Sequence, residues 1–320
     1  MGIPNLNRFL IDNCGKNAIK KMHLKNFKDK TVVVDTSIYL YKFVSENTLM
    51  ESMYLFISIL KHYKIIPLFI FDGKPPAEKR DLLIKRLMEK KEAEKKYNEL
   101  KIKLTTARNE EKPIIIQDME YLKRQFVRIN DDDIQKVKGL MDAYGVTYYD
   151  AQGEADKLCA YLLKIGKAWA CISDDMDMFL YGCPYVIRGI SMLKHTCLFY
   201  DTEAILKDLE MSNKQFCEIM VLSGTDYNLD VNVSLKETIN WYYEYNKYCA
   251  KSENPYGFYV WLVKNTKYIK DYKKLLNVYK IFQFYNDKEL ENWDNIEAIE
   301  KPMNNEALIN IMKKEGFVFI

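Results

Sequence analysis

Acidic residues stand where several apolar segments of this chain end. The segment 170–179 begins as an apolar run and continues into three aspartates, Asp174, Asp175 and Asp177. Other apolar runs end at an acid, and two further acids open a predicted helix: Asp35, Asp72, Asp226, Glu154 and Asp156. The carboxyl ends of parallel strands lie at one edge of a sheet, where α/β proteins bind their ligands. The sequence therefore predicts that these acids converge at one edge of one sheet.

Converging carboxylates indicate a metal site. Taken singly, an aspartate after a strand is most often a helix N-cap or a turn residue, and Asp174 fits that explanation best. Together the acids repel one another, because two unit charges ~4 Å apart cost about 4 kcal/mol near a protein surface. Oxygen ligands without nearby His or Cys favour Mg²⁺, or Mn²⁺ in its place, over Zn²⁺. Two such ions drive in-line hydrolysis of a phosphodiester.

The elements that carry these acids alternate between strands and helices. Apolar runs predict strands over 32–34, 67–71, 146–149 and 168–173, and a hairpin pair over 185–188 and 197–200. Periodic apolar residues predict helices over 5–13, 37–44, 48–63, 114–144, 153–165 and 212–222. This alternation is typical of an α/β fold with a mostly parallel sheet flanked by helices.

A basic segment follows Asp72. Between Lys79 and Lys112 there are twelve Lys or Arg against seven Asp or Glu. A solvated helix with i,i+4 ion pairs would explain this composition. The alternative is a basic helix or arch that contacts phosphates. Because Lys79, Lys85 and Arg86 follow Asp72 by only 7, 13 and 14 positions, their position favours the second interpretation.

Composition limits the class of protein and its compartment. The 320 residues carry a formal charge of +3, which does not by itself indicate a nucleic-acid partner. Seven Cys without CxxC pairs indicate reduced thiols in an intracellular protein. We expect no signal peptide and no membrane span, because no apolar run approaches 18 residues. We expect one α/β region over 1–110, its completion over 111–230, and an aromatic helical region over 231–320.

With these residues assembled, the chain resembles the flap endonuclease family of structure-specific 5′ nucleases. The matching segments are Met1–Ile3, Val34–Tyr41, Phe71–Pro76 with Lys79 and Lys85–Arg86, Ala151–Asp156, Ser173–Asp177 and Leu222–Tyr227. The resemblance implies a PIN-like nuclease fold with a mixed, mainly parallel sheet, a helical arch over 78–130 and a C-terminal helical region. It also implies hydrolysis at 5′ flaps, nicks, gaps or branched DNA by two Mg²⁺ ions, in replication, repair or recombination.

The resemblance also implies a role for each matched side chain. Four acids would bind one metal ion: Asp35, Asp72, Glu154 and Asp156. Asp175, Asp177 and Asp226 would bind the other. Lys79 and Arg86 would hold the scissile phosphate, and the DNA contacts would include Gly2, Tyr41 and Lys85. Asp156 is shorter than the Glu expected there, so we expect a water molecule between it and the metal.

Three departures from the family pattern concern substrates and partners. Residues 228–236 lack the glycines and proline of the loop that grips duplex DNA, so we expect weaker grip and no K⁺. The connection 45–49 is too short for the usual wedge and pocket that recognise a 3′ flap. The chain ends at Ile320 without a sliding-clamp motif, so we expect no clamp partner, and we expect a monomer. We also expect residues 81–130 to be mobile without DNA.

Two alternatives stay open. The same chemistry would serve a nuclease for RNA or for simple DNA ends, acting as an exonuclease. A catalytically silent nucleic-acid-binding scaffold would keep the fold but would have lost ligand acids, and the matched acids are all present. DNA with single-strand/double-strand junctions is the expected partner, in the nucleus or at another site of DNA replication.

Overall fold

The computed structural model describes residues 3–228, 234–284, 293 and 295–319. The chain divides into two compact units, each built from separate stretches of sequence. Unit 1 comprises residues 1–34 and 156–297, and unit 2 comprises residues 35–155 and 298–320. The three consecutive regions expected from the sequence are a different division and stay a prediction.

The strands form the mixed, mostly parallel sheet that the sequence predicts, in the order β1-β7-β6-β5-β2-β3-β4. Their bounds are β1 Ile19–His23, β2 Thr31–Asp35, β3 Ile66–Phe71, β4 Thr147–Asp150, β5 Ala170–Ile172, β6 Tyr185–Ser191 and β7 Thr196–Asp201. Parallel pairing joins β2 to β5, β5 to β6 and β3 to β4. Antiparallel pairing joins β7 to β6 and to β1. Nearly continuous apolar residues make β2 and β3 buried on both faces, as parallel strands usually are.

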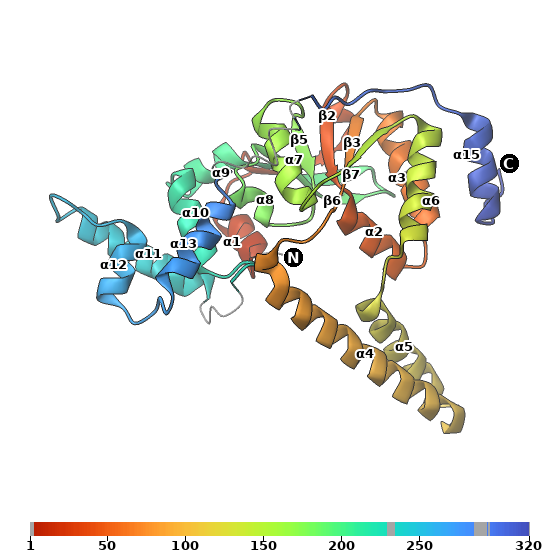
Figure 1. The fold of residues 1–320 in the computed structure, drawn as a ribbon, viewed down its shortest axis with the longest axis horizontal. Helices are drawn as coiled ribbons and strands as arrows, with labels where there is room; N and C mark the ends of the chain where they lie inside the picture. The colour runs from red at the N-terminus through yellow and green to blue at the C-terminus, as the bar shows by residue number, and fades with distance from the viewer. Residues whose placement is uncertain (1–2, 229–233, 285–292, 294, 320) are drawn as a thin grey trace. The chain divides into compact units, whose positions relative to one another are not determined.

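Unit 1 adds a series of helices to its strands (Figure 1). They are α1 Leu6–Asn13, η1 Leu24–Phe27, α7 Ala155–Lys164, α8 Asp177–Leu180, α9 Thr202–Asp208, α10 Asn213–Leu222, α11 Leu235–Cys249, α12 Phe258–Asn265 and α13 Tyr272–Ile281. Capping boxes fix two of their starts: Ser212 with Gln215 begins α10, and Ser234 with Glu237 begins α11. Aromatic residues of α11 and α12 contact one another, as Tyr245 and Phe258 do, and Tyr242, Phe258 and Tyr259 are buried between the helices of this unit.

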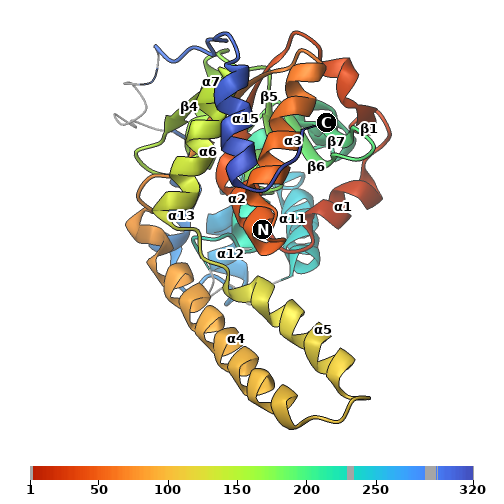
Figure 2. The same cartoon turned by 90° about the vertical axis from the view of Figure 1, so that its right-hand side faces the viewer.

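Unit 2 combines packed helices with a long helical hairpin. Its helices are α2 Thr36–Ser45, α3 Leu49–His62, η2 Ala77–Lys79, α4 Arg80–Thr106, α5 Lys112–Lys123, η3 Arg124–Phe126, α6 Asp131–Tyr144 and α15 Asn305–Lys314. Figure 2 shows α15 beside α6 and shows α4 and α5 as an arm that extends from the rest of this unit. None of the helices that the structure describes is long and apolar enough to cross a membrane.

The helical hairpin corrects one prediction. The helix expected over 114–144 is interrupted at residues 124–130, because Asn130 forms a capping box with Asp133 that begins α6. The interruption is fastened to α4, where Lys90 Nζ donates to the Val127 carbonyl at 3.0 Å. Arg128 also pairs with Glu94 at 3.1 Å. The basic segment is therefore one leg of a two-helix arm, and its mobility without DNA stays a prediction.

Candidate active site

In unit 1, the turn that follows β5 holds two buried carboxylates side by side. Asp175 is 6% exposed and Asp177 is 2% exposed. The Asp177 N–H donates to Asp175 Oδ1 at 3.0 Å, and the Asp175 N–H donates to the Ser173 hydroxyl at 3.1 Å. The backbone turn thus keeps both acids near the end of β5. Burial of two neighbouring carboxylates is costly unless a cation binds them.

Asp174, between them and β5, has a structural partner instead. Its Oδ1 accepts a hydrogen bond of 2.8 Å from the Gly189 N–H on β6. This contact is structural, but it joins two segments 15 positions apart and is not the helix N-cap or turn contact that the sequence predicts for Asp174. We therefore expect Asp175 and Asp177, and not Asp174, to offer their oxygens to a ligand.

The other two predicted acids of unit 1 lie at helix and turn positions. Asp156 is half-buried in the first turn of α7, and Asp226 is half-buried in the turn after α10. That turn is closed by Asn228, whose Oδ1 accepts from the Thr225 N–H at 2.7 Å and whose amide donates to the Val221 carbonyl at 2.7 Å. The turn that carries Asp226 is therefore fixed by its own hydrogen bonds.

Unit 2 places its acids at the ends of β2 and β3 and just before α7. Asp35 is 3% exposed and occupies the N-cap position of α2, without a capping hydrogen bond from its side chain to the described backbone of that helix. Asp72 is exposed, and its Oδ1 accepts from the Ala155 N–H at 2.8 Å. Asp72 is thereby tied to the segment that carries Glu154.

Glu154 forms an ion pair with Lys79, and both side chains are nearly buried, at 14% and 11% exposure. The structure thus brings together an expected metal ligand and an expected phosphate-binding cation. The other cation, Arg86, is half-buried on α4, and Lys85 beside it is exposed. Burial and the nearby charges of Arg128 and Arg86 lower the pKa of Lys90 on the same helix.

The structure describes two of the three predicted DNA contacts, Lys85 and Tyr41. Tyr41 on α2 is 47% exposed, so its ring is accessible as a stacking surface requires. Lys90 Nζ lies 5.1 Å from the centre of that ring. Gly2 lies outside the described residues, as does most of the altered 228–236 segment.

A glycine holds the Asp72 and Glu154 segments together. The Gly73 N–H donates to the Gly153 carbonyl at 2.7 Å, and the Lys74 N–H donates to the Gln152 carbonyl at 3.1 Å. A Cβ at residue 73 would lie 2.6 Å from the Gln152 carbonyl oxygen and closer still to that of Ala151. The two backbones therefore approach so closely that a side chain does not fit at this position.

Gly73→Ala is expected to destabilise the protein by roughly 1–3 kcal/mol, because the backbone must shift to admit the methyl group. The shift separates Asp72 from Glu154, so cleavage of a DNA substrate should slow by about 10²-fold. Urea unfolding and single-turnover kinetics measure the two effects. The matched control is Gly139→Ala on α6, where an added Cβ meets open space. If both alanine variants cleave at the wild-type rate, this glycine does not position the acids.

The acids fit a hard divalent cation. Carboxylate oxygens are the donors that Mg²⁺ and Mn²⁺ prefer, and burial of Asp35, Asp175 and Asp177 gives a reason for a cation to bind. In the part of the chain that the structure describes, no three His, Cys, Asp or Glu side chains form a ready-made metal cluster. The metal-binding set therefore stays a prediction.

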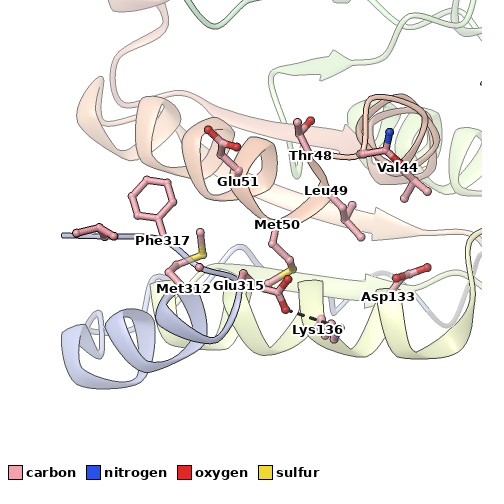
Figure 3. A pocket seen from close by; sticks show the side chains of 13 residues that line it. Val44, Thr48, Leu49, Met50, Glu51, Asp133, Lys136, Met312, Glu315 and Phe317 are labelled. Carbon is pink, nitrogen blue, oxygen red and sulfur yellow. Dashed lines mark ion pairs between the residues drawn. The ribbon is translucent and has the colours of Figure 1, made fainter. Parts of the chain in front are cut away.

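A pocket of about 600 Å³ lies beside the short 45–49 connection (Figure 3). The connection was expected to be too short for a flap-binding pocket, and the pocket here is built with help from α6 and the residues after α15. Its charged residues are Glu51, Asp133, Glu315 and Lys136. Lys136 already pairs with Glu315 and with Asp132. Three acids against one paired lysine make this pocket a poor site for a phosphate.

Arg188 carries no signal in the sequence, where it is one residue of a predicted hairpin strand. In the structure, its Nη2 donates to the Asp174 carbonyl at 2.6 Å. Asp174 begins the turn that carries Asp175 and Asp177, which we call the acidic turn.

Two protein-family models and several curated relatives match this chain. Models of the XPG N-terminal domain and the XPG I-region match residues 1–93 and 145–226, which together make up more than half of the chain. Flap endonuclease 1 of Vanderwaltozyma polyspora is 27% identical over 335 residues, spanning 98% of this chain and 83% of that protein. Flap endonuclease 1 of Komagataella phaffii is 33% identical over 247 residues, spanning 71% and 63%.

Solved structures show the same fold. The catalytic core of Rad2 in complex with a DNA substrate has a TM-score of 0.68 and 23% identity, covering 99% of this chain and 96% of that one. Flap endonuclease-1 from Methanococcus jannaschii has a TM-score of 0.59 and 20% identity, covering 93% and 90%. With the two family models and the curated relatives taken together, the chain belongs to the flap endonuclease family, as its motifs predict.

Proposed function

We propose that this protein is a structure-specific 5′ nuclease that hydrolyses phosphodiester bonds where single-stranded and double-stranded DNA meet. The family supports the reaction, and the buried pair Asp175 and Asp177 is the observation that carries it. Burial of these two carboxylates at a strand end costs free energy in the apolar core, and a bound cation would offset that cost. The silent-scaffold alternative is weaker, because the matched acids are all present.

The proposed ligand set follows the sequence motifs. One Mg²⁺ would be held by Asp35, Asp72, Glu154 and Asp156, and the other by Asp175, Asp177 and Asp226. When bound, the ions supply a hydroxide nucleophile and stabilise the leaving oxygen. Mn²⁺ is expected to substitute, because it accepts the same oxygen ligands.

The chain's own cations would hold the substrate. Lys79 forms an ion pair with Glu154, so its ammonium group lies beside an acid of the proposed metal-binding set. We propose that Lys79 and Arg86 bind the scissile phosphate and stabilise the charge that develops on it. Lys85 and the exposed ring of Tyr41 would contact the DNA nearby.

The substrate would be DNA at replication or repair sites inside the cell, bound by a monomer. The preference among flaps, nicks and gaps would depend on the 45–49 connection and the 228–236 segment, which both depart from the family pattern. The acidic pocket beside 45–49 does not favour a phosphate, so recognition of a 3′ flap there should be weak. Activity on RNA or on simple DNA ends is the alternative that this departure favours.

Single-turnover cleavage of a 5′-labelled double-flap DNA tests the proposal, with a matched single-stranded oligonucleotide, each with Mg²⁺ and with EDTA. Cutting near the flap junction only with Mg²⁺ is the expected result. Equal metal-dependent cutting of both substrates would discard junction specificity and keep the chemistry. If neither substrate is cut, the silent-scaffold alternative replaces the nuclease.

A further inference from the structure

The turn that carries Asp175 and Asp177 is fastened at its first residue by β6. Asp174 is held twice, through its carboxylate by the Gly189 N–H at 2.8 Å and through its carbonyl by Arg188 Nη2 at 2.6 Å. The neighbouring Ser173 N–H donates to the Ile187 carbonyl at 3.2 Å. Three consecutive residues of β6 thus hold the start of the acidic turn.

An irregularity in β6 makes these contacts available. The pairing of β6 with β7 is regular up to Arg188 and Leu198, and then shifts register before Ser191 and Thr196. In such a bulge, the extra residue is left out of the hydrogen-bond ladder between the strands, so its backbone N–H and carbonyl can bond to other partners. Gly189 lies within it at φ +57°, a left-handed conformation that glycine adopts readily. Its N–H can therefore serve Asp174.

The guanidinium of Arg188 also reaches the N-terminal helix. Its Nη1 donates to Asn7 Oδ1 on α1 at 3.0 Å and contacts the sulfur of Met176, inside the acidic turn. The Tyr200 hydroxyl donates to the same Asn7 oxygen at 2.7 Å. Burial raises the pKa of Tyr200, so this hydroxyl keeps its proton at neutral pH. The guanidinium lies 5.7 Å from the centre of the Tyr200 ring.

We propose that Arg188 is a positioning residue for the metal-binding acids Asp175 and Asp177, fixed by Asn7 and Tyr200. This rests on the proposed function, because it assumes that the two acids bind a metal. The planar fork of arginine is required, since its two nitrogens reach different partners, the carbonyl of Asp174 and the amide oxygen of Asn7. A lysine keeps the charge but not both contacts.

The test is Mn²⁺ binding to the intact protein, followed by the electron paramagnetic resonance signal of the free ion. Groups that orient a metal's ligands usually change its affinity by about 10- to 100-fold, so Arg188→Lys should weaken Mn²⁺ binding by that factor. DNA affinity in EDTA should stay at the wild-type value. Raising the Mn²⁺ concentration should return the cleavage rate toward wild type, which a general folding defect would not allow.

Two further variants guard against a folding defect. Tyr200→Phe removes only the hydroxyl that fixes Asn7, so it should lower Mn²⁺ affinity severalfold with the ring packing kept. Arg8→Lys is the matched control on α1, because Arg8 is 85% exposed and pairs only weakly with Asp12. Its Mn²⁺ affinity should equal that of the wild type.

The outcomes separate this inference from the proposed function. If the wild type binds Mn²⁺ and Asp177→Asn does not, while Arg188→Lys binds as the wild type does, the positioning role is overturned and the nuclease stands. An Arg188→Lys protein whose cleavage stays slow even at saturating Mn²⁺, in proportion to its loss of thermal stability, also overturns it. A wild type that binds no Mn²⁺ overturns both proposals.

Discussion

Asp177→Asn is expected to abolish metal-dependent cleavage while the fold is retained. The residue is 2% exposed, and its backbone N–H donates to the carboxylate of the neighbouring Asp175. An amide of the same shape keeps the packing but removes a negative oxygen, so single-turnover cleavage should fall by roughly a thousandfold or more. The metal-free variant should unfold at the wild-type temperature or above it, because one of two adjacent buried charges is gone.

Thermal unfolding with and without Mg²⁺ sharpens this prediction. A ligand that binds the folded state raises its stability, so Mg²⁺ should stabilise the wild type and have less effect on Asp177→Asn. Asp12→Asn is a suitable control, because that carboxylate is 61% exposed and lies in a surface pair. Retained cleavage in a clean Asp177→Asn preparation would show that this acid is not part of the catalytic site.

Lys79→Met is the second large effect that we expect. If the ammonium stabilises charge on the scissile phosphate, its loss should slow single-turnover cleavage by about 10²- to 10³-fold. DNA affinity, measured with Ca²⁺ to prevent cleavage, should change much less, because the contact strengthens in the transition state. Equal losses in affinity and rate would instead make Lys79 a general DNA-binding residue.

The ion pair with Glu154 predicts a second consequence of the same change. Removing one member of a nearly buried pair costs roughly 3 kcal/mol, so metal-free Lys79→Met should be less stable. Adding Glu154→Gln should recover most of that stability without recovering cleavage. The matched control is Lys28→Met, whose ion pair with Asp29 is exposed. If the double variant is no more stable than the single one, the pair does not explain the loss.

The sequence determined the elements whose signals are local. Each of these signals lies within a few consecutive residues. Examples are the apolar runs of β2 and β3, the capping residues of α10, and the acids that directly follow the strands. The strand β1 was missed, because only two of its five residues are apolar and its pairing with β7 decides its conformation. The break before α6 was missed although Asn130 and Asp133 carried a capping signal.

Only the tertiary structure decided which side chains meet. Lys79 and Glu154 are 75 positions apart and become an ion pair through the close approach of Gly73 to the 151–153 backbone. Arg188 contacts the acidic turn because β6 has a bulge, which no local pattern in the sequence predicts. Periodicity and capping act over about four residues, whereas these contacts depend on the path of the whole chain. The sequence therefore supplied the acids and their chemistry, and the fold supplied the groups that hold them.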